Sequence, residues 1–242
     1  MLMKKICFLF LMLLNMLSVS AYDFSAENDD GVTIYYNTID DNSVEVTRNN
    51  NSYSGSVVIP SVVIYNGKNY NVTSIGYSAF SGYSDLTSVT IPESVTSIGD
   101  WAFSACSSLT EITIPESVTS IGRSAFENCS SLTSIIIPES VTAIGEQAFY
   151  NTAWFNNQSK GIVYINSVLY KYKGNMPGNT HIVIKDGIKS ISNSAFYGCS
   201  SLTSVIIPES VTEIGRYAFS GCSDLTSITI PESVTVIGDY AF

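Results

Sequence analysis

Apolar and polar residues recur along most of this chain in a fixed order that repeats at every twenty-third position. The dipeptide Ala-Phe marks each period, and successive marks lie one period apart except for one interval that is a single residue longer than two periods. The phenylalanines of these dipeptides are Phe80, Phe103, Phe126, Phe149, Phe196, Phe219 and Phe242. A constant period of this length predicts a solenoid in which each period forms one coil.

Residues 86–108 show how the pattern specifies the first half of a coil. Leu86, Val89 and Ile91 alternate with Ser and Thr, which predicts an extended segment whose apolar side chains point inward. The sequence Pro-Glu-Ser then turns the chain, because proline fixes φ and has no N–H for a β-ladder. Val95 and Ile98 indicate a second, shorter extended piece.

The second half of the coil is expected to be a turn. Gly99 allows a bend that a Cβ would hinder. Residues 100–106 are expected to form one short helical turn that buries Ala102, Phe103 and Cys106. The order Leu-x-x-Val-x-Ile at the start of a unit of this length is typical of leucine-rich repeats. We therefore predict a β-rich leucine-rich-repeat solenoid whose stacked coils share one apolar interior.

Two stretches interrupt the period. Residues 22–73 contain extended runs at 32–36 and 44–47, followed by a predicted hairpin of 62–65 and 70–73 around Asn66-Gly67, a favoured turn pair. We interpret this region as an N-terminal β cap over the end of the core.

The second interruption, residues 151–180, predicts an antiparallel β-hairpin of strands 162–165 and 168–172. Because aromatic residues most often serve packing, we expect those of this insertion to bridge two blocks of repeats rather than to form a binding site. They are Trp154, Phe155, Tyr164, Tyr170 and Tyr172.

These features divide the chain into five parts. The predicted parts are a signal peptide (1–21), a β cap with lead-in strands (22–73), a first repeat block (74–154), a β-hairpin insertion (155–178) and a second block (179–242). The sequence stops at Phe242, at the Ala-Phe mark of the repeat that begins at Leu225, before that repeat is complete and without a polar cap. Since solenoids need capped ends, we expect the second block to be incomplete.

The first 21 residues have the order of a cleaved export signal. Lys4 and Lys5 precede an apolar run at residues 6–17, and Val19-Ser20-Ala21 forms a small-residue cleavage site. The run is short and contains Asn15, whereas a membrane span needs about 20 apolar residues. We expect a secreted or surface protein without an integral span after cleavage, although an uncleaved anchor is the alternative.

The net charge narrows the possible partners. It is −10 for the chain, and removal of the signal takes away Lys4 and Lys5 but no acid, which leaves −12. An acidic chain without a basic stripe has nothing to neutralise phosphates, so nucleic acid and anionic lipid are excluded as partners.

The repeat L-T-S-x-x-I-P-E-S-V-T-x-I-G-x-x-A-F-x-x-C-S resembles the BspA-type leucine-rich repeats of bacterial surface antigens, over residues 57–242. Tyr53-Ser54-Gly55 and Val58-Ile59-Pro60 are similar to the lead-in of that family. The resemblance implies a secreted or surface-attached protein, and some members of the family are adhesins for host matrix proteins. It carries over no ligand-binding residue, because the recurring residues are those that build the coil.

Catalytic and metal-binding chemistry has little support in the sequence. The single histidine, His181, lies in a strand-like segment, and no nucleophile elbow or oriented base accompanies it. One glutamate per coil follows a proline and could offer carboxylates to calcium, but repeated acidic ligand loops are missing, so we interpret these side chains as solvated and predict no metal or cofactor. These glutamates are Glu93, Glu116, Glu139, Glu209 and Glu232.

Cysteines also recur with the coil. Cys106 and Cys129 are one period apart, as are Cys199 and Cys222. Each pair should stack in adjacent coils at a distance that permits a disulfide, and export would permit oxidation. We favour free, buried thiols, because this column lies at an inward turn where Tyr83 occupies the preceding coil.

A candidate partner surface follows from comparing the coils with one another. Thr87 and its equivalents are uniform, whereas the column two residues after the glycine varies between Trp101, Ser124, Gln147, Tyr217 and Tyr240, next to Asp100, Arg123, Glu146 and Arg216. Exposed Trp, Tyr and Arg are typical interface anchors, although turns also tolerate substitution. The predicted partner-binding residues are Trp101, Arg123, Tyr150, Tyr197, Arg216, Tyr217 and Tyr240.

The sequence thus predicts an exported, non-catalytic protein that presents a surface to an extracellular protein or glycan, in adhesion or another host or partner interaction. The alternatives are a structural spacer of the cell envelope without a specific ligand, and an enzyme or an accessory domain of one.

Overall fold

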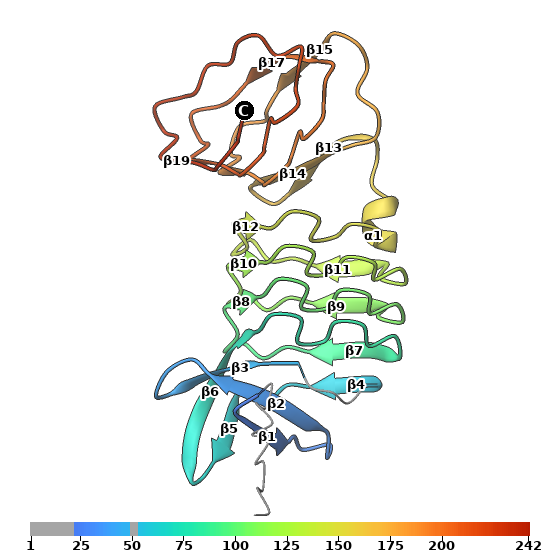
Figure 1. Cartoon of the computed structure of the whole chain (residues 1–242), viewed down its shortest axis with the longest axis vertical. Helices are drawn as coiled ribbons and strands as arrows, with labels where there is room; N and C mark the ends of the chain where they lie inside the picture. Colours follow the sequence, from blue (N-terminus) through green and yellow to red (C-terminus); the bar gives the residue numbers. More distant parts are fainter. Residues whose placement is uncertain (1–21, 49–52) are drawn as a thin grey trace, which may run out of the picture.

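The computed structural model describes residues 22–48 and 53–242, so the predicted signal peptide lies outside the described residues. The chain forms the predicted β-solenoid, with about seven turns and almost no helix (Figure 1). No helix in the described residues is long and apolar enough to cross a membrane.

The first block stacks its coils through two short strands per coil. One set of strands, β8, β10 and β12, continues the sheet of the N-terminal cap, and the other forms the parallel pairs β4–β7 and β9–β11. The strands are β4 Gly55–Val58, β7 Leu86–Thr90, β8 Ser97–Ile98, β9 Glu111–Thr113, β10 Ser120–Ile121, β11 Ser134–Ile136 and β12 Ala143–Ile144. Neighbouring coils pair one repeat apart, for example Ser97 with Ser120.

The predicted inward residues form the core. Leu86, Val95 and Phe103 are fully buried, and the phenylalanines of successive coils stack face to face. Ring centroids are 5.1 Å apart for Phe80–Phe103 and 5.2 Å for Phe103–Phe126, with nearly parallel planes. Each coil therefore covers the aromatic face that the previous coil leaves open, which is why a single repeat could not exclude water alone.

The predicted helical turn around Ala-Phe is wrong: residues 100–105 form a non-helical turn. Trp101 and Ala105 have positive φ (54° and 61°), which breaks a right-handed helix. Their N–H groups donate to the carbonyls of Arg123 and Glu127 in the next coil, and the N–H of Phe103 donates to that of Ala125. Hydrogen bonds to the next coil thus alternate with bonds inside the turn, such as that of the Ala102 N–H to the Gly99 carbonyl, in place of the bonds of a helix.

The glycine before this turn is required by stacking. A Cβ on Gly145 would lie 2.4 Å from the backbone nitrogen of Arg123, and one on Gly122 would lie 2.5 Å from that of Asp100. Neither glycine has a positive φ. The expected role of this glycine as a bend is therefore secondary to the close approach of two backbones.

The cap is a small mixed sheet that joins the solenoid, antiparallel except where β3 pairs with β6. Its strands are β1 Phe24–Glu27, β2 Thr33–Thr38, β3 Ser43–Val46, β5 Val62–Tyr65 and β6 Lys68–Ile75. β5 and β6 form the predicted hairpin around Asn66-Gly67, where both residues have positive φ. β6 then pairs in parallel with β8, and Tyr53 packs 5.1 Å from Phe80, so the cap continues both the sheet and the aromatic stack.

The second interruption contains the predicted hairpin, β13 Gly161–Ile165 and β14 Val168–Lys173, after a single helical turn, α1 Ala153–Asn156. The hairpin separates two clusters of buried residues. Alternate side chains along its two strands pack into different blocks. Those that pack into the first block are Val163, Ile165, Val168 and Tyr170. Those that pack into the second block are Ile162, Tyr164, Leu169 and Tyr172.

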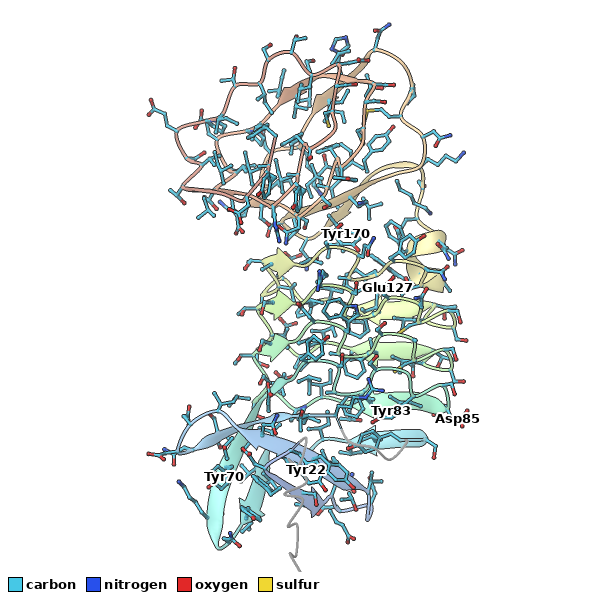
Figure 2. All side chains as sticks on the ribbon, in the orientation of Figure 1. Tyr22, Tyr70, Tyr83, Asp85, Glu127 and Tyr170 are labelled. Atoms are coloured by element: carbon cyan, nitrogen blue, oxygen red, sulfur yellow. The ribbon has the colours of Figure 1, made fainter. Side chains whose placement is uncertain are left out.

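Tyr170 ends the first aromatic stack. Its ring lies edge-on to Phe149 at 5.6 Å, and Figure 2 shows it between the first block and the hairpin. In the other coils, the N–H of the stacked phenylalanine donates to an alanine carbonyl of the following coil. The N–H of Phe149 donates instead to Tyr170 Oη, at 3.0 Å. Burial raises the pKa of Tyr170, so the phenol stays protonated. The aromatics of the insertion bridge the two blocks, as expected.

The second block begins on the hairpin. β14 pairs with β16 in a sheet of order β13-β14-β16-β18-β19, and β15 pairs with β17. The strands are β15 Thr180–Val183, β16 Ser190–Ile191, β17 Leu202–Ile206, β18 Glu213–Ile214 and β19 Val236–Ile237. In Figure 1 the first block's coils are seen edge-on and the second block's coils as open loops, so the solenoid axis bends at the hairpin.

The described cysteines are free, and three of the four are buried as predicted, whereas the predicted burial is wrong for Cys199. Cys106 and Cys129 are fully buried, and their thiols donate to the carbonyls of Phe80 and Phe103 at 3.0 Å. Cys222 is buried and Cys199 is half-buried. Burial raises the pKa of Cys199, and it raises the pKa of Cys222 to about 11.

The glycine column provides a stability test. Gly145→Ala should lower the free energy of unfolding by about 1–3 kcal/mol, because the added Cβ forces two coils apart. Gly178→Ala is the matched control, since a Cβ there meets nothing within 4 Å. Urea denaturation compares the two variants, and equal midpoints would contradict the role of the column.

The thiols provide a second test. Iodoacetamide near pH 8 should alkylate Cys106, Cys129 and Cys222 slowly in the folded chain and rapidly in concentrated urea, because the fold shields a buried thiol from the reagent. The pKa of Cys222 is about 11 in the folded chain and about 8.5 in the unfolded chain. The stability that depends on its neutral thiol is therefore fully present below about pH 8.5 and is lost as the pH rises towards about 11. Mass spectrometry of the alkylated chain counts the reacted thiols. A disulfide would show as an unalkylated, unreduced chain that is lighter by two hydrogens than the reduced chain.

Candidate functional site: a cleft at the bend

A cleft of about 720 Å³ lies where the two blocks meet, and we call it the elbow cleft. One wall comes from the last three coils of the first block and the other from the first two coils of the second block. Its lining residues are Asp100, Ile121–Arg123, Thr142–Glu146, Ser190–Asn193, Glu213 and Gly215–Tyr217. The Ser190 hydroxyl donates to the Thr142 carbonyl at 3.0 Å, which joins the two walls.

The wall of the first block carries a stacked arginine. The Arg123 guanidinium lies over the Trp101 ring, 4.0 Å from its centroid, and Tyr77 packs edge-on against the same ring. Asp100 fixes the local backbone, because its carboxylate accepts the N–H of Arg123 at 2.7 Å. Trp101 therefore holds the exposed guanidinium flat at the edge of the cleft.

The wall of the second block repeats this arrangement. The Arg216 guanidinium lies over the Tyr217 ring at 4.7 Å and donates to the Tyr217 hydroxyl at 3.2 Å. Tyr240 stacks on Tyr217, with centroids 5.3 Å apart. Asn193 takes the role of Asp100, since its side-chain oxygen accepts the N–H of Arg216 at 2.7 Å.

Ser192, between the walls, departs from the repeat. It stands where the other coils have glycine, and its N–H donates to the Leu169 carbonyl of the hairpin at 2.9 Å. The side chain fits because an extended strand, rather than another coil, precedes it. Ser192 is 6% exposed, and its Oγ has no hydrogen-bond partner among the described residues. An unpaired buried hydroxyl costs about 1–3 kcal/mol.

Charges of both signs line the elbow cleft. Asp100, Glu146 and Glu213 supply carboxylates, and Arg123 and Arg216 supply guanidinium groups. Beside it, the Lys171 ammonium donates to the Ser194 carbonyl at 3.0 Å. Burial lowers the pKa of Lys171, and the Glu146 carboxylate opposes that shift.

The structure brings together some of the predicted partner-binding residues. Arg123, Arg216 and Tyr217 line the cleft, and Trp101 and Tyr240 support them from outside the lining. Tyr197 lies edge-on to Tyr217 at 6.4 Å. Tyr150 is exposed but makes no ring contact with the other described residues, so it stays apart from this group.

Sequence reasoning missed Ser192, Asn193, Glu213 and Tyr77. Only Ser192 left a clear signal, because it is a single serine in a column of glycines. The other glycines of the column are Gly76, Gly99, Gly122, Gly145, Gly215 and Gly238.

The other candidates are isolated on the surface. His181 is exposed on β15, where its Nδ1 contacts the Ser204 hydroxyl at 2.7 Å, and the post-proline glutamates are exposed. The part of the chain that the structure describes contains no group of three or more His, Cys, Asp or Glu side chains able to hold a metal ion.

Fold and repeat together define a leucine-rich-repeat solenoid. The profile of the BspA type leucine-rich repeat region matches residues 47–177 and 163–242, with six copies, and the chain belongs to this family. A comparison with curated protein sequences finds no match.

Two solved structures illustrate the likeness. A leucine-rich cell surface protein from Faecalibacterium prausnitzii is 33% identical with a TM-score of 0.53, over 90% of this chain and 52% of its own. A leucine-rich-repeat protein from Bacteroides ovatus is 35% identical with a TM-score of 0.51, over 91% of this chain and 50% of its own. The chain therefore spans about half the length of these relatives.

A double-mutant cycle tests the stacked arginine. Trp101→Ala and Arg123→Ala should show a coupling of about 0.5–1 kcal/mol in the free energy of unfolding, the usual value for an exposed cation–π pair. Lys185→Ala, which removes a cation from Tyr164 instead, should be additive with Trp101→Ala. If the first pair is also additive, Trp101 does not hold Arg123.

Proposed function

We propose that this chain is an exported, non-catalytic leucine-rich-repeat protein that binds an extracellular protein or glycan through the surface around the elbow cleft. Its role would be adhesion or another host or partner interaction. One observation carries the proposal: two arginine–aromatic stacks from separate blocks border the same cleft. Aromatic and arginine side chains held in fixed positions are typical anchors of binding surfaces.

The constancy of the scaffold supports this location. Trp101, Tyr217 and Tyr240 occupy a column with positive φ that every coil shares, and their N–H groups or those of their equivalents bind the next coil. The backbone therefore makes the same contact in five coils, at Ser78, Trp101, Ser124, Ser194 and Tyr217, while the side chains differ. A side chain that the scaffold does not use is available to a partner.

The proposed location outside the cell rests on the first 21 residues and on the family. Lys4 and Lys5, the apolar run and Val19-Ser20-Ala21 have the order of a signal peptide. One similar structure is described as a cell surface protein.

Alanine substitution tests the proposed surface. Residues 22–242 are purified and screened against immobilised extracellular matrix proteins, a glycan array and bacterial cells. Trp101→Ala, Arg216→Ala and Tyr217→Ala should each weaken binding to the partner found by about 30-fold or more, as anchors of an interface do. Thermal melting should change little, because none of these side chains is buried in the core.

Glu93→Ala, at an exposed turn away from the cleft, is the control and should bind as the unaltered chain does. Binding that survives all three substitutions would place the partner elsewhere. A chain that binds nothing in the screen would favour the structural spacer.

A further inference from the structure

The elbow cleft offers hydrogen bonds rather than apolar pockets. The isoleucines of its lining, Ile121, Ile144 and Ile191, are at most 4% exposed and point into the core. The surfaces that remain are mostly glycine backbone, hydroxyl, amide and charged groups, together with the Ala143 side chain and the Tyr217 ring. A peptide needs apolar pockets for its anchor residues or an open strand edge, and these walls present charged and hydroxyl side chains instead. A ligand covered in hydroxyl groups fits such walls.

The mixture of charges narrows the ligand further. Asp100, Glu146 and Glu213 accept hydrogen bonds, which suits the hydroxyls of a sugar and opposes a densely charged polyanion. The Arg123 guanidinium has no polar partner among the described residues, and that of Arg216 has only the Tyr217 hydroxyl. Two guanidinium groups with free donors match a carboxylate, which arginine binds with paired hydrogen bonds.

Ser192 adds an independent observation. It is the one departure from glycine in its column, it lines the cleft, and its buried hydroxyl lacks a partner among the described residues. Rotation about its Cα–Cβ bond redirects Oγ without moving the backbone. Its hydroxyl both donates and accepts, as does the hydroxyl of a sugar.

We propose that the elbow cleft binds a short oligosaccharide that carries a carboxylate. Arg123 or Arg216 takes the carboxylate, the acids and Asn193 take ring hydroxyls, and Ser192 takes one hydroxyl at the floor. The volume of about 720 Å³ is in the usual range of roughly 300–1,000 Å³ for small-ligand sites. This inference rests on the proposed function and names the ligand class of the same site.

Titration calorimetry with defined sugars tests the inference. The probes are a trisaccharide of galacturonic acid and its uncharged galactose counterpart, and sialyllactose and uncharged lactose. At least one acidic probe should bind residues 22–242, about tenfold or more tightly than its uncharged counterpart, because a charge-assisted hydrogen bond is lost with the carboxylate. The two pairs distinguish a uronic acid from a sialic acid.

Cleft variants connect binding to these residues. Arg123→Ala or Arg216→Ala should weaken binding by about tenfold or more. Ser192→Gly restores the residue of the other coils, so it should fold normally and weaken binding by about two- to tenfold. Lys68→Ala removes a cation from the cap instead and should have no effect.

The outcomes separate the inference from the proposed function. If neither acidic sugar binds, or if the cleft variants bind as well as the unaltered chain, the sugar site is wrong. If a matrix protein binds the unaltered chain but not the Trp101→Ala and Tyr217→Ala variants, the proposed function still holds, with a protein as the partner. If the sugars bind only weakly and equally with and without the carboxylate, the proposed recognition by arginine is wrong.

Discussion

The close approach of consecutive coils is the constraint on which the rest of the structure depends. Two backbones come so near at the glycine column that a Cβ has no space, and the N–H groups of Trp101, Phe103 and Ala105 donate to carbonyls of the next coil. This spacing also lets phenylalanine rings stack with centroids 5.1–5.6 Å apart in the first block. The short distance between consecutive coils therefore explains three features of the repeat: the glycine column, the turn with positive φ, and the stack of phenylalanine rings.

The hairpin can replace a coil in the stack because other atoms of its own make the hydrogen bonds and core contacts that a coil would make. Tyr170 Oη replaces a carbonyl for the Phe149 N–H, and the Tyr172 N–H replaces that of a phenylalanine for the Ala195 carbonyl. Alternate side chains of its strands fill two cores, as the two faces of a strand allow. A strand that makes these hydrogen bonds and core contacts need not follow the path of a coil. The bend of the solenoid and the elbow cleft lie at this hairpin.

The sequence predicted the architecture because the period, the inward residues and the Asn-Gly hairpin are local signals. It could not predict the turn around Ala-Phe, since the hydrogen bond that accompanies the positive φ of Trp101 runs from the Trp101 N–H to the Arg123 carbonyl in the next coil. The candidate surface was found only in part. Trp101, Arg216 and Tyr217 differ visibly between coils, but the position of Arg123 and Arg216 on the same cleft depends on the direction of the hairpin, which no repeat encodes. Ser192 was readable in principle as a break in a column of glycines.

The separation of the two cores by the hairpin has a consequence for how such a protein can vary. A repeat added to either block meets the same glycine, phenylalanine and strand contacts that its neighbours already make, so it lengthens one arm and leaves the corner as it is. A substitution in the hairpin changes the corner and leaves the arms as they are. Reach and angle are thus set by different stretches of the gene, and each can change without the other.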